Sequence, residues 1–127
     1  MGLQGFVVVG LGAALGAWLR WGLGLLLNAV FPLLPLGTLI ANLSGGLMMG
    51  IAMGLISSNA GLSEEVRLLV MTGFLGGLTT FSTFSAESAS LFASGEYGWA
   101  AAHILTHVAG SILMTILGIY LFHLVKA

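Results

Sequence analysis

Long apolar stretches, interrupted by short polar segments, dominate the chain. Four of them predict membrane-spanning helices, over residues of about 5–28, 36–56, 63–94 and 99–125. A helix needs about 20 predominantly apolar residues to cross the hydrocarbon core of a bilayer, and each stretch reaches that length. Two prolines at Phe31–Pro35 predict a turn after the first span, and a polar segment at 57–63 predicts a loop after the second. The pattern therefore predicts an all-α membrane protein with four transmembrane helices.

The third stretch is about thirty residues long, which is more than one straight span requires. Its middle, Gly73–Ser85, gathers glycines, hydroxyls and three phenylalanines. The glycines followed by Thr79 and Thr80 predict a break in the helix near residues 76–79. Irregular backbone at membrane depth is tolerated where protein buries it or where it lines a cavity, and freed carbonyls there bind ions. The alternative is an unbroken, glycine-rich packing helix.

Small and polar residues recur every four positions in the first two spans, so each set lies along one helix face. The sets are Gly12, Gly16, Arg20, Gly24 and Asn28, and Thr38, Asn42, Gly46, Gly50 and Gly54. Such stripes favour close helix packing. Because four spans enclose little space, the stripes predict at least a dimer. The alternative is that the glycines only let helices of one chain touch.

Two polar side chains in these spans need partners. Arg20 costs roughly 2.5 kcal/mol or more inside a bilayer unless it reaches the interface or faces water. It therefore either extends to the interface or lines an aqueous vestibule that gathers anions. Asn42 must face protein, water or a ligand because lipid offers its amide no partner. Contact with another helix and contact with a ligand both remain open.

The fourth span carries a polar ladder of His103, His107, Ser111 and Thr115 at four-residue intervals. No carboxylate or thiol is expected near the two histidines, so neither a catalytic metal site nor a nucleophile is predicted. The i, i+4 spacing leaves weak metal binding open. We expect a protein that is not an enzyme.

Composition strengthens the membrane assignment, since 58% of residues are hydrophobic, only 6% are charged and the mean hydropathy is +1.12. The formal net charge is −1 without a basic cluster, so no nucleic-acid partner is expected. Without cysteine, disulfides and thiolate metal sites are excluded. The first apolar run lacks a basic leader, which predicts insertion without cleavage. No linker divides the chain, so 1–127 is expected to form one domain.

Few basic residues direct the orientation of the chain in the membrane. Arg67 and Lys126 lie toward the side of the termini, and Arg20 lies toward the other side. Lysine and arginine counts set orientation, and two against one is a weak bias. The chain is therefore compatible with insertion in both directions and with an antiparallel dimer, although many small proteins with a weak bias insert in one direction.

The polar side chains of the spans suit a small anion. They are the Asn42 amide and the hydroxyls of Thr38, Thr80, Ser82, Thr83, Ser111 and Thr115, with no lysine in any span. Neutral hydrogen-bond donors replace the water molecules around an anion but bind it weakly enough for it to leave. Phe81 and Phe84 are three residues apart and share a helix face. Their ring edges carry partial positive charge and favour an anion, although the same rings would also fill a core.

At these positions the chain resembles the CrcB/Fluc family of small membrane fluoride channels. Gly16-Ala-Trp-Leu-Arg20 resembles the family's GAxxR motif, Gly37-Thr-Leu-Ile-Ala-Asn42 its GTxxxN motif, and Gly73–Ser85 its signature in the third helix. The resemblance covers essentially the whole chain. The third motif is highly specific, whereas the first two are weak alone.

The resemblance implies a fluoride-selective channel that passively exports fluoride across a bacterial inner membrane and relieves fluoride toxicity. It implies an antiparallel, dual-topology homodimer with two pores at the subunit interface and a structural sodium ion between the broken third helices. The carbonyls of Gly76 and Thr79 are expected to bind sodium, and Arg20 to line the vestibule. The roles of Glu87, Thr80 and His107 stay open. The residues expected to line the fluoride pore are Asn42, Phe81, Phe84, Thr38, Ser82, Thr83, Ser111 and Thr115.

Two other functions compete with this prediction. A small proton-coupled multidrug antiporter also has four spans and dual topology, but it needs a buried acid. Glu87 is the only candidate, and the first span, where that family keeps its acid, has none. A non-transporting assembly subunit is the second alternative, and it predicts no ion flux.

Overall fold

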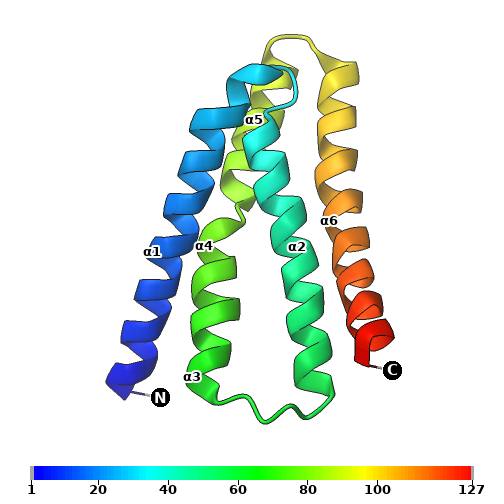
Figure 1. Ribbon diagram of the computed structural model, residues 1–127. Helices are drawn as coiled ribbons and strands as arrows, with labels where there is room; N and C mark the ends of the chain where they lie inside the picture. Colours follow the sequence, from blue (N-terminus) through cyan, green and yellow to red (C-terminus); the bar gives the residue numbers. More distant parts are fainter. Residues whose placement is uncertain (1, 127) are drawn as a thin grey trace.

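The computed structural model describes residues 2–126 as a bundle of helices, with both ends of the chain at the same end of the bundle (Figure 1). Four helical stretches are long and apolar enough to cross a membrane: Gly2–Val30, Leu36–Ser57, Glu64–Ala93 and Tyr97–Lys126. The predicted all-α fold with four membrane-spanning helices is therefore confirmed. Residues 1 and 127 of the expected domain lie outside the described part of the chain.

The first two spans form a helical hairpin. Helix α1 (Gly2–Leu27) continues into the short 3-10 helix η1 (Asn28–Val30), and α2 (Leu36–Ser57) starts directly after Pro35. Proline lacks a backbone N–H and restricts the residue before it, so helix continuation through this segment is disfavoured. Across the turn, the Thr38 backbone N–H donates to Asn28 Oδ1 at 3.2 Å. Asn28 therefore replaces a backbone partner that the start of α2 lacks.

The third span is divided into several pieces. Its order is α3 (Glu64–Arg67), the π-helix η2 (Leu68–Leu75), α4 (Gly76–Leu78) and α5 (Phe81–Ala93). The Ser63 hydroxyl accepts the Val66 backbone N–H at 3.2 Å, so the start of this span is capped by a side chain. The π-helical stretch was not predicted, because apolar periodicity does not distinguish it from an α-helix.

The third helix breaks at Thr79 and Thr80, which are both extended between α4 and α5. The predicted break near residues 76–79 is therefore placed slightly too early, since Gly76 itself is helical. Glycine permits irregular backbone but does not require it. The interruption instead falls on the two threonines, and the Thr80 hydroxyl replaces the backbone acceptor of the Thr83 N–H.

Gly95, with a φ of +76°, joins α5 to the last helix, α6 (Tyr97–Lys126). This left-handed conformation suits glycine because it has no Cβ. The turn returns the chain antiparallel to α5 and places α6 against α2 and α5. The polar ladder of the fourth span therefore faces the middle of the bundle.

The glycine stripes pack helices within one chain. A Cβ at Gly16 would collide with the backbone of Phe74 and Leu78, and one at Gly50 would collide with the backbone of Thr115. The first stripe thus lies on the third span and the second stripe on α6. The stripes therefore give no independent support for a dimer, because helices of the same chain already occupy these packing surfaces. The dimer itself stays a prediction.

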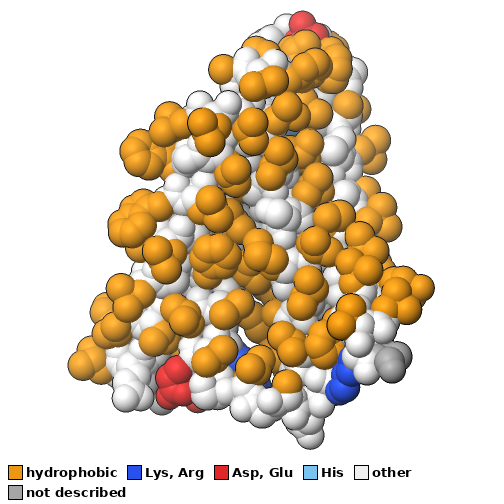
Figure 2. All heavy atoms as spheres, in the orientation of Figure 1, with side chains coloured by type: hydrophobic (Ala, Val, Ile, Leu, Met, Phe, Trp, Pro, Cys, Tyr) orange, Lys and Arg blue, Asp and Glu red, His pale blue; other side chains and the backbone are white. Residues whose placement is uncertain are grey.

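The face of the molecule seen in Figure 2 carries hydrophobic side chains over most of its height. Acidic side chains appear at both ends of the molecule, and the visible lysine and arginine side chains lie at the end that carries the termini. Large hydrophobic side chains such as Phe6 and Trp18 are exposed on α1. An apolar belt between two polar ends is the surface that a lipid bilayer solvates.

Candidate functional site

The two threonines of the break make different side-chain hydrogen bonds. The Thr79 hydroxyl donates at 2.8 Å to the Leu75 carbonyl, which also accepts the Thr79 backbone N–H at 3.0 Å. The Thr80 hydroxyl accepts the Thr83 backbone N–H at 3.1 Å and caps the start of α5. Threonine favours this capping geometry over a helix interior, where its branched Cβ is restricted. Thr80 therefore caps the start of a new helix in the middle of a span.

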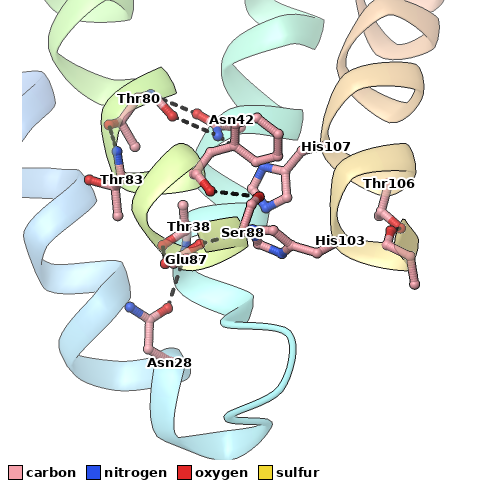
Figure 3. A network of polar contacts seen from close by, with 12 residues as sticks. Asn28, Thr38, Asn42, Thr80, Thr83, Glu87, Ser88, His103, Thr106 and His107 are labelled. Carbon is pink, nitrogen blue, oxygen red and sulfur yellow. Dashed lines mark hydrogen bonds and ion pairs between the residues drawn. The ribbon is translucent and has the colours of Figure 1, made fainter. Parts of the chain in front are cut away.

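Asn42 of α2 forms hydrogen bonds with the backbone of the break (Figure 3). Its Oδ1 accepts the Thr80 backbone N–H at 2.7 Å, and its Nδ2 donates to the Thr80 carbonyl at 3.1 Å. These two contacts fix the orientation of the amide. The amide nitrogen also lies 3.0 Å from Nδ1 of His107 on α6. Asn42 therefore joins three helical segments, and contacts within the chain occupy its amide.

The fixed Asn42 amide determines which nitrogen of His107 accepts a hydrogen bond. Because Nδ2 of Asn42 is a donor, Nδ1 of His107 must accept, and the neutral ring then carries its hydrogen on Nε2. His107 is only 3% exposed. Its Nε2 has no hydrogen-bond partner among residues 2–126. His107 thus presents a buried N–H donor that the chain does not use.

A second set of polar contacts, among Thr38, Glu87 and His103, lies next to the contacts of Asn42 and closer to the α1–α2 turn. The Thr38 hydroxyl donates to Glu87 Oε2 at 2.7 Å, and Glu87 Oε1 lies 3.3 Å from His103 Nε2. Figure 3 shows the side chains of α2, α5 and α6 converging here. The expectation that no carboxylate approaches the histidines was wrong, because α5 brings Glu87 beside α6. A lone acidic residue within a membrane span needs a partner. The position of Glu87 in the third span could therefore have indicated a contact with a histidine of the fourth.

The two aromatic residues of the signature have different surroundings. Phe84 is 6% exposed, and its ring lies 4.9 Å from the His107 ring and 5.4 Å from the His103 ring. Phe81 is 76% exposed, although its ring lies only 5.3 Å from that of Phe84. Phe84 therefore packs against the histidines, whereas Phe81 projects from the chain at the depth of the break.

A cavity of about 430 Å³ lies between the break, α2 and α6. Of the residues predicted for a pore or a sodium site, it brings together Asn42, Phe81, Phe84, Ser111, Thr115, Gly76 and Thr79. Thr80 and His107, whose roles were left open, also line it. The Thr115 hydroxyl lies 3.0 Å from each of the carbonyl oxygens of Gly46 and Ser111 and shares its one hydrogen between them. The cavity thus combines aromatic rings, hydroxyls and backbone oxygens.

The remaining predicted pore residues lie outside this cavity. Thr83 lines a second cavity of about 550 Å³, together with Glu87 and Glu96. The Thr38 hydroxyl is engaged by Glu87, and the hydroxyl of the exposed Ser82 lies 3.3 Å from that of Thr80. The predicted polar residues are therefore divided between two cavities, and Thr38 and Ser82 line neither of them.

Arg20 reaches the break from α1, where its Nε donates to the Gly77 carbonyl at 3.1 Å. In an unbroken helix the backbone N–H of residue 81 would bond to this carbonyl. The arginine thus satisfies an oxygen that the break releases. Whether it also lines a vestibule, as predicted, stays a prediction.

The carbonyls predicted to bind sodium have lost their usual helical partners. The Thr80 N–H, which an unbroken helix would direct to the Gly76 carbonyl, donates to Asn42. The Thr83 N–H, which would bond to the Thr79 carbonyl, donates to the Thr80 hydroxyl. Freed carbonyl oxygens of interrupted membrane helices bind small cations. The two predicted residues therefore fit the chemistry of a sodium site.

These features define a class: a four-span helical membrane protein whose interrupted third helix meets a polar and aromatic cavity. A family model described as "CrcB-like protein, Camphor Resistance (CrcB)" matches residues 7–119. The chain belongs to this family, so the resemblance found in its motifs is confirmed. It is a multi-pass membrane protein, since four of its helices can span a bilayer.

Curated relatives are similar along nearly their whole length. Proteins named "Fluoride-specific ion channel FluC" from Cupriavidus taiwanensis and Nitrosospira multiformis are each 56% identical to the chain. The aligned segments cover 98% of both proteins in the first comparison, and 94% of this chain and 93% of the relative in the second. A relative of the same name from Pseudomonas putida is 54% identical over 98% of both proteins.

Proposed function

We propose that the protein is a fluoride-selective ion channel of the bacterial inner membrane, which lets fluoride leave the cell passively and thereby relieves fluoride toxicity. The observation that carries the proposal is the 56% identity to a fluoride-specific ion channel over 98% of both chains. The cavity beside the break supports it, because rings and neutral polar groups suit a small anion that must both bind and leave.

Within the channel, Phe81 and Phe84 supply ring edges, which are the positive part of the aromatic quadrupole. Ser111 supplies a hydroxyl within the same cavity. His107 adds an Nε2–H donor, and Asn42 sets its tautomer by occupying Nδ1. In this chain Asn42 therefore acts mainly by positioning Thr80 and His107, while Thr38, Ser82, Thr83 and Thr115 complete the polar rim of the path.

We assign the working form to an antiparallel homodimer with a pore on each side of its interface. The argument rests on exposure at the break. Gly76 and Phe81 are exposed in the single chain. The Gly76 carbonyl has lost its helical N–H partner, and an unpaired backbone oxygen at membrane depth must be buried or line a cavity. A second copy over this face covers both residues. It also brings a second pair of Gly76 and Thr79 carbonyls, so that four backbone oxygens would hold one sodium ion. Bound sodium would supply positive charge and hold the two breaks together.

Removal of sodium is expected to shift the protein from dimer to monomer, because repelling carbonyls would then face each other across the interface. The measurement is the molar mass in detergent by light scattering, in sodium chloride and in N-methylglucamine chloride of equal ionic strength. A dimer fraction that is the same in both salts would contradict the sodium site. A monomer in both would contradict the dimer itself.

Expression of the protein is expected to restore growth of a bacterium that lacks its own fluoride exporter, at a fluoride concentration that stops the parent strain. Phe84→Ile, produced at the same level in the membrane, serves as the control and is expected to protect poorly. Absence of rescue by the unmodified protein would contradict the proposed function. Protection against a cationic drug, but not against fluoride, would instead support the antiporter.

A further inference from the structure

Three ionisable side chains form a compact, largely buried group, of which the proposed channel uses only His107. Glu87 comes from α5, and His103 and His107 come from successive turns of α6. One nitrogen or oxygen atom from each residue lies within 4.8 Å of the other two. His103 is fully buried, and Glu87 is partly buried. We refer to Glu87, His103 and His107 as the His–Glu cluster.

The His–Glu cluster is incompletely satisfied by the rest of the chain. Glu87 Oε1, both ring nitrogens of His103 and Nε2 of His107 have no hydrogen-bond partner among residues 2–126. His103 Nε2 and Glu87 Oε1 are 3.3 Å apart but do not have hydrogen-bond geometry. Buried polar atoms without partners are costly, so native proteins rarely retain them without another role. A ligand shared by the three side chains would engage one nitrogen or oxygen atom of each residue.

The donor set identifies the chemical class of that ligand. Two imidazoles and one carboxylate are typical of zinc and other divalent transition metals, whereas magnesium and calcium prefer oxygen ligands alone. The i, i+4 spacing of the histidines places both rings on one face of α6. The Thr38 hydroxyl holds Glu87 Oε2 at 2.7 Å and leaves Oε1 toward His103. Such an outer contact is what orients a metal-binding carboxylate.

We propose that the His–Glu cluster binds a divalent transition-metal ion such as Zn²⁺. His103 Nε2 and Glu87 Oε1 form the first pair of ligands, because nothing else in the described chain engages them. His107 is the third ligand. Water would occupy the fourth position of a tetrahedral site.

Binding by His107 competes with Asn42. The lone pair of His107 Nδ1 already faces the Asn42 amide at 3.0 Å, and in that tautomer Nε2 carries the hydrogen. Either ring nitrogen therefore becomes a metal ligand only when the contact with Asn42 is given up. Coordination through Nε2 would also remove the His107 N–H donor from the anion path.

The position of the His–Glu cluster explains why a bound metal would slow the passage of fluoride. Glu87 lines the second cavity, and His107 lines the cavity beside the break. The cluster thus lies between the two spaces. Glu96 also lines the second cavity and favours entry of a cation from that side. Inhibition of fluoride passage by the metal rests on the proposed function, whereas metal binding itself does not.

Metal binding is tested with purified dimer that carries no polyhistidine tag, by Zn²⁺ titration calorimetry and by the visible spectrum of added Co²⁺. We expect one ion per chain, the intense bands of tetrahedral Co²⁺, and affinity reduced at least about 100-fold in His103→Gln and Glu87→Gln. Thr38→Val, which removes only the outer contact, is expected to weaken binding about 10-fold. His123→Ala is the matched control, since His123 is exposed near the end of the same helix, and it should bind like the unmodified protein.

Absence of saturable binding or of tetrahedral Co²⁺ bands in the unmodified protein would overturn the metal site, whether or not the variants fold. So would Zn²⁺ affinity that is unchanged in both His103→Gln and Glu87→Gln. Fluoride efflux from liposomes gives the second measurement. Zn²⁺ is expected to slow efflux through the unmodified protein and through His123→Ala, but not through His103→Gln. Saturable binding without slower efflux would overturn the inhibitory effect and leave the metal site standing.

Discussion

Fluoride efflux from liposomes is expected to fall about tenfold or more when Phe84 is replaced by isoleucine. The ring of Phe84 borders the cavity beside the break and packs against both His103 and His107. Isoleucine keeps much of the apolar volume but has no positive ring edge to offer an anion. A contact energy of about 1.4 kcal/mol at the barrier corresponds to a tenfold change in rate.

Phe81→Ile distinguishes a loss of efflux from a loss of stability more clearly than Phe84→Ile does. Phe81 is mostly exposed in the single chain, so its replacement removes little internal packing. We expect a similar loss of efflux with an unchanged unfolding midpoint. Phe92→Ile is the matched control, because Phe92 is an exposed phenylalanine of the same helix that lies outside both cavities. Unchanged efflux in both Phe81→Ile and Phe84→Ile would remove the rings from the mechanism.

Asn42→Ala is expected to lower the free energy of unfolding by about 2 kcal/mol or more. The substitution removes the partners of the Thr80 N–H and the Thr80 carbonyl, and an orphaned buried group costs about 1–3 kcal/mol. It also releases Nδ1 of His107. Tryptophan fluorescence during denaturation by sodium dodecyl sulfate measures the change, since the chain has three tryptophans.

Ser44→Ala is the control for Asn42→Ala. Ser44 lies on the same helix, and its hydroxyl donates only to the Ala41 carbonyl of that helix at 3.3 Å. Its loss is expected to change stability little. Equal stability of the two variants would contradict the view that Asn42 holds the break.

The spans were predictable from the sequence because each one is long and apolar, and the turns between them contain proline, glycine or polar residues. The break was predictable to within a few residues, since glycines and threonines cluster in one span. Its position at Thr79 and Thr80 depends on Asn42, which is distant in sequence and replaces the missing helical partner of Thr80. Local propensity does not contain that information.

The surroundings of the candidate site were less predictable. The four-residue spacing of His103 and His107 indicated a polar face on α6, but not that Glu87 of α5 would lie against it. The glycine stripes indicated close contacts but not their partners, which prove to be helices of the same chain. Such pairings depend on how helices cross, and that is a property of the whole bundle.

Fluoride efflux from liposomes that contain the purified, unmodified protein, measured beside chloride efflux with ion-selective electrodes, tests the central claim most directly. The proposed channel predicts rapid fluoride efflux down its gradient, with chloride retained, and without any requirement for a proton gradient. Equal efflux of the two anions, or no efflux of either, would contradict a fluoride-selective channel.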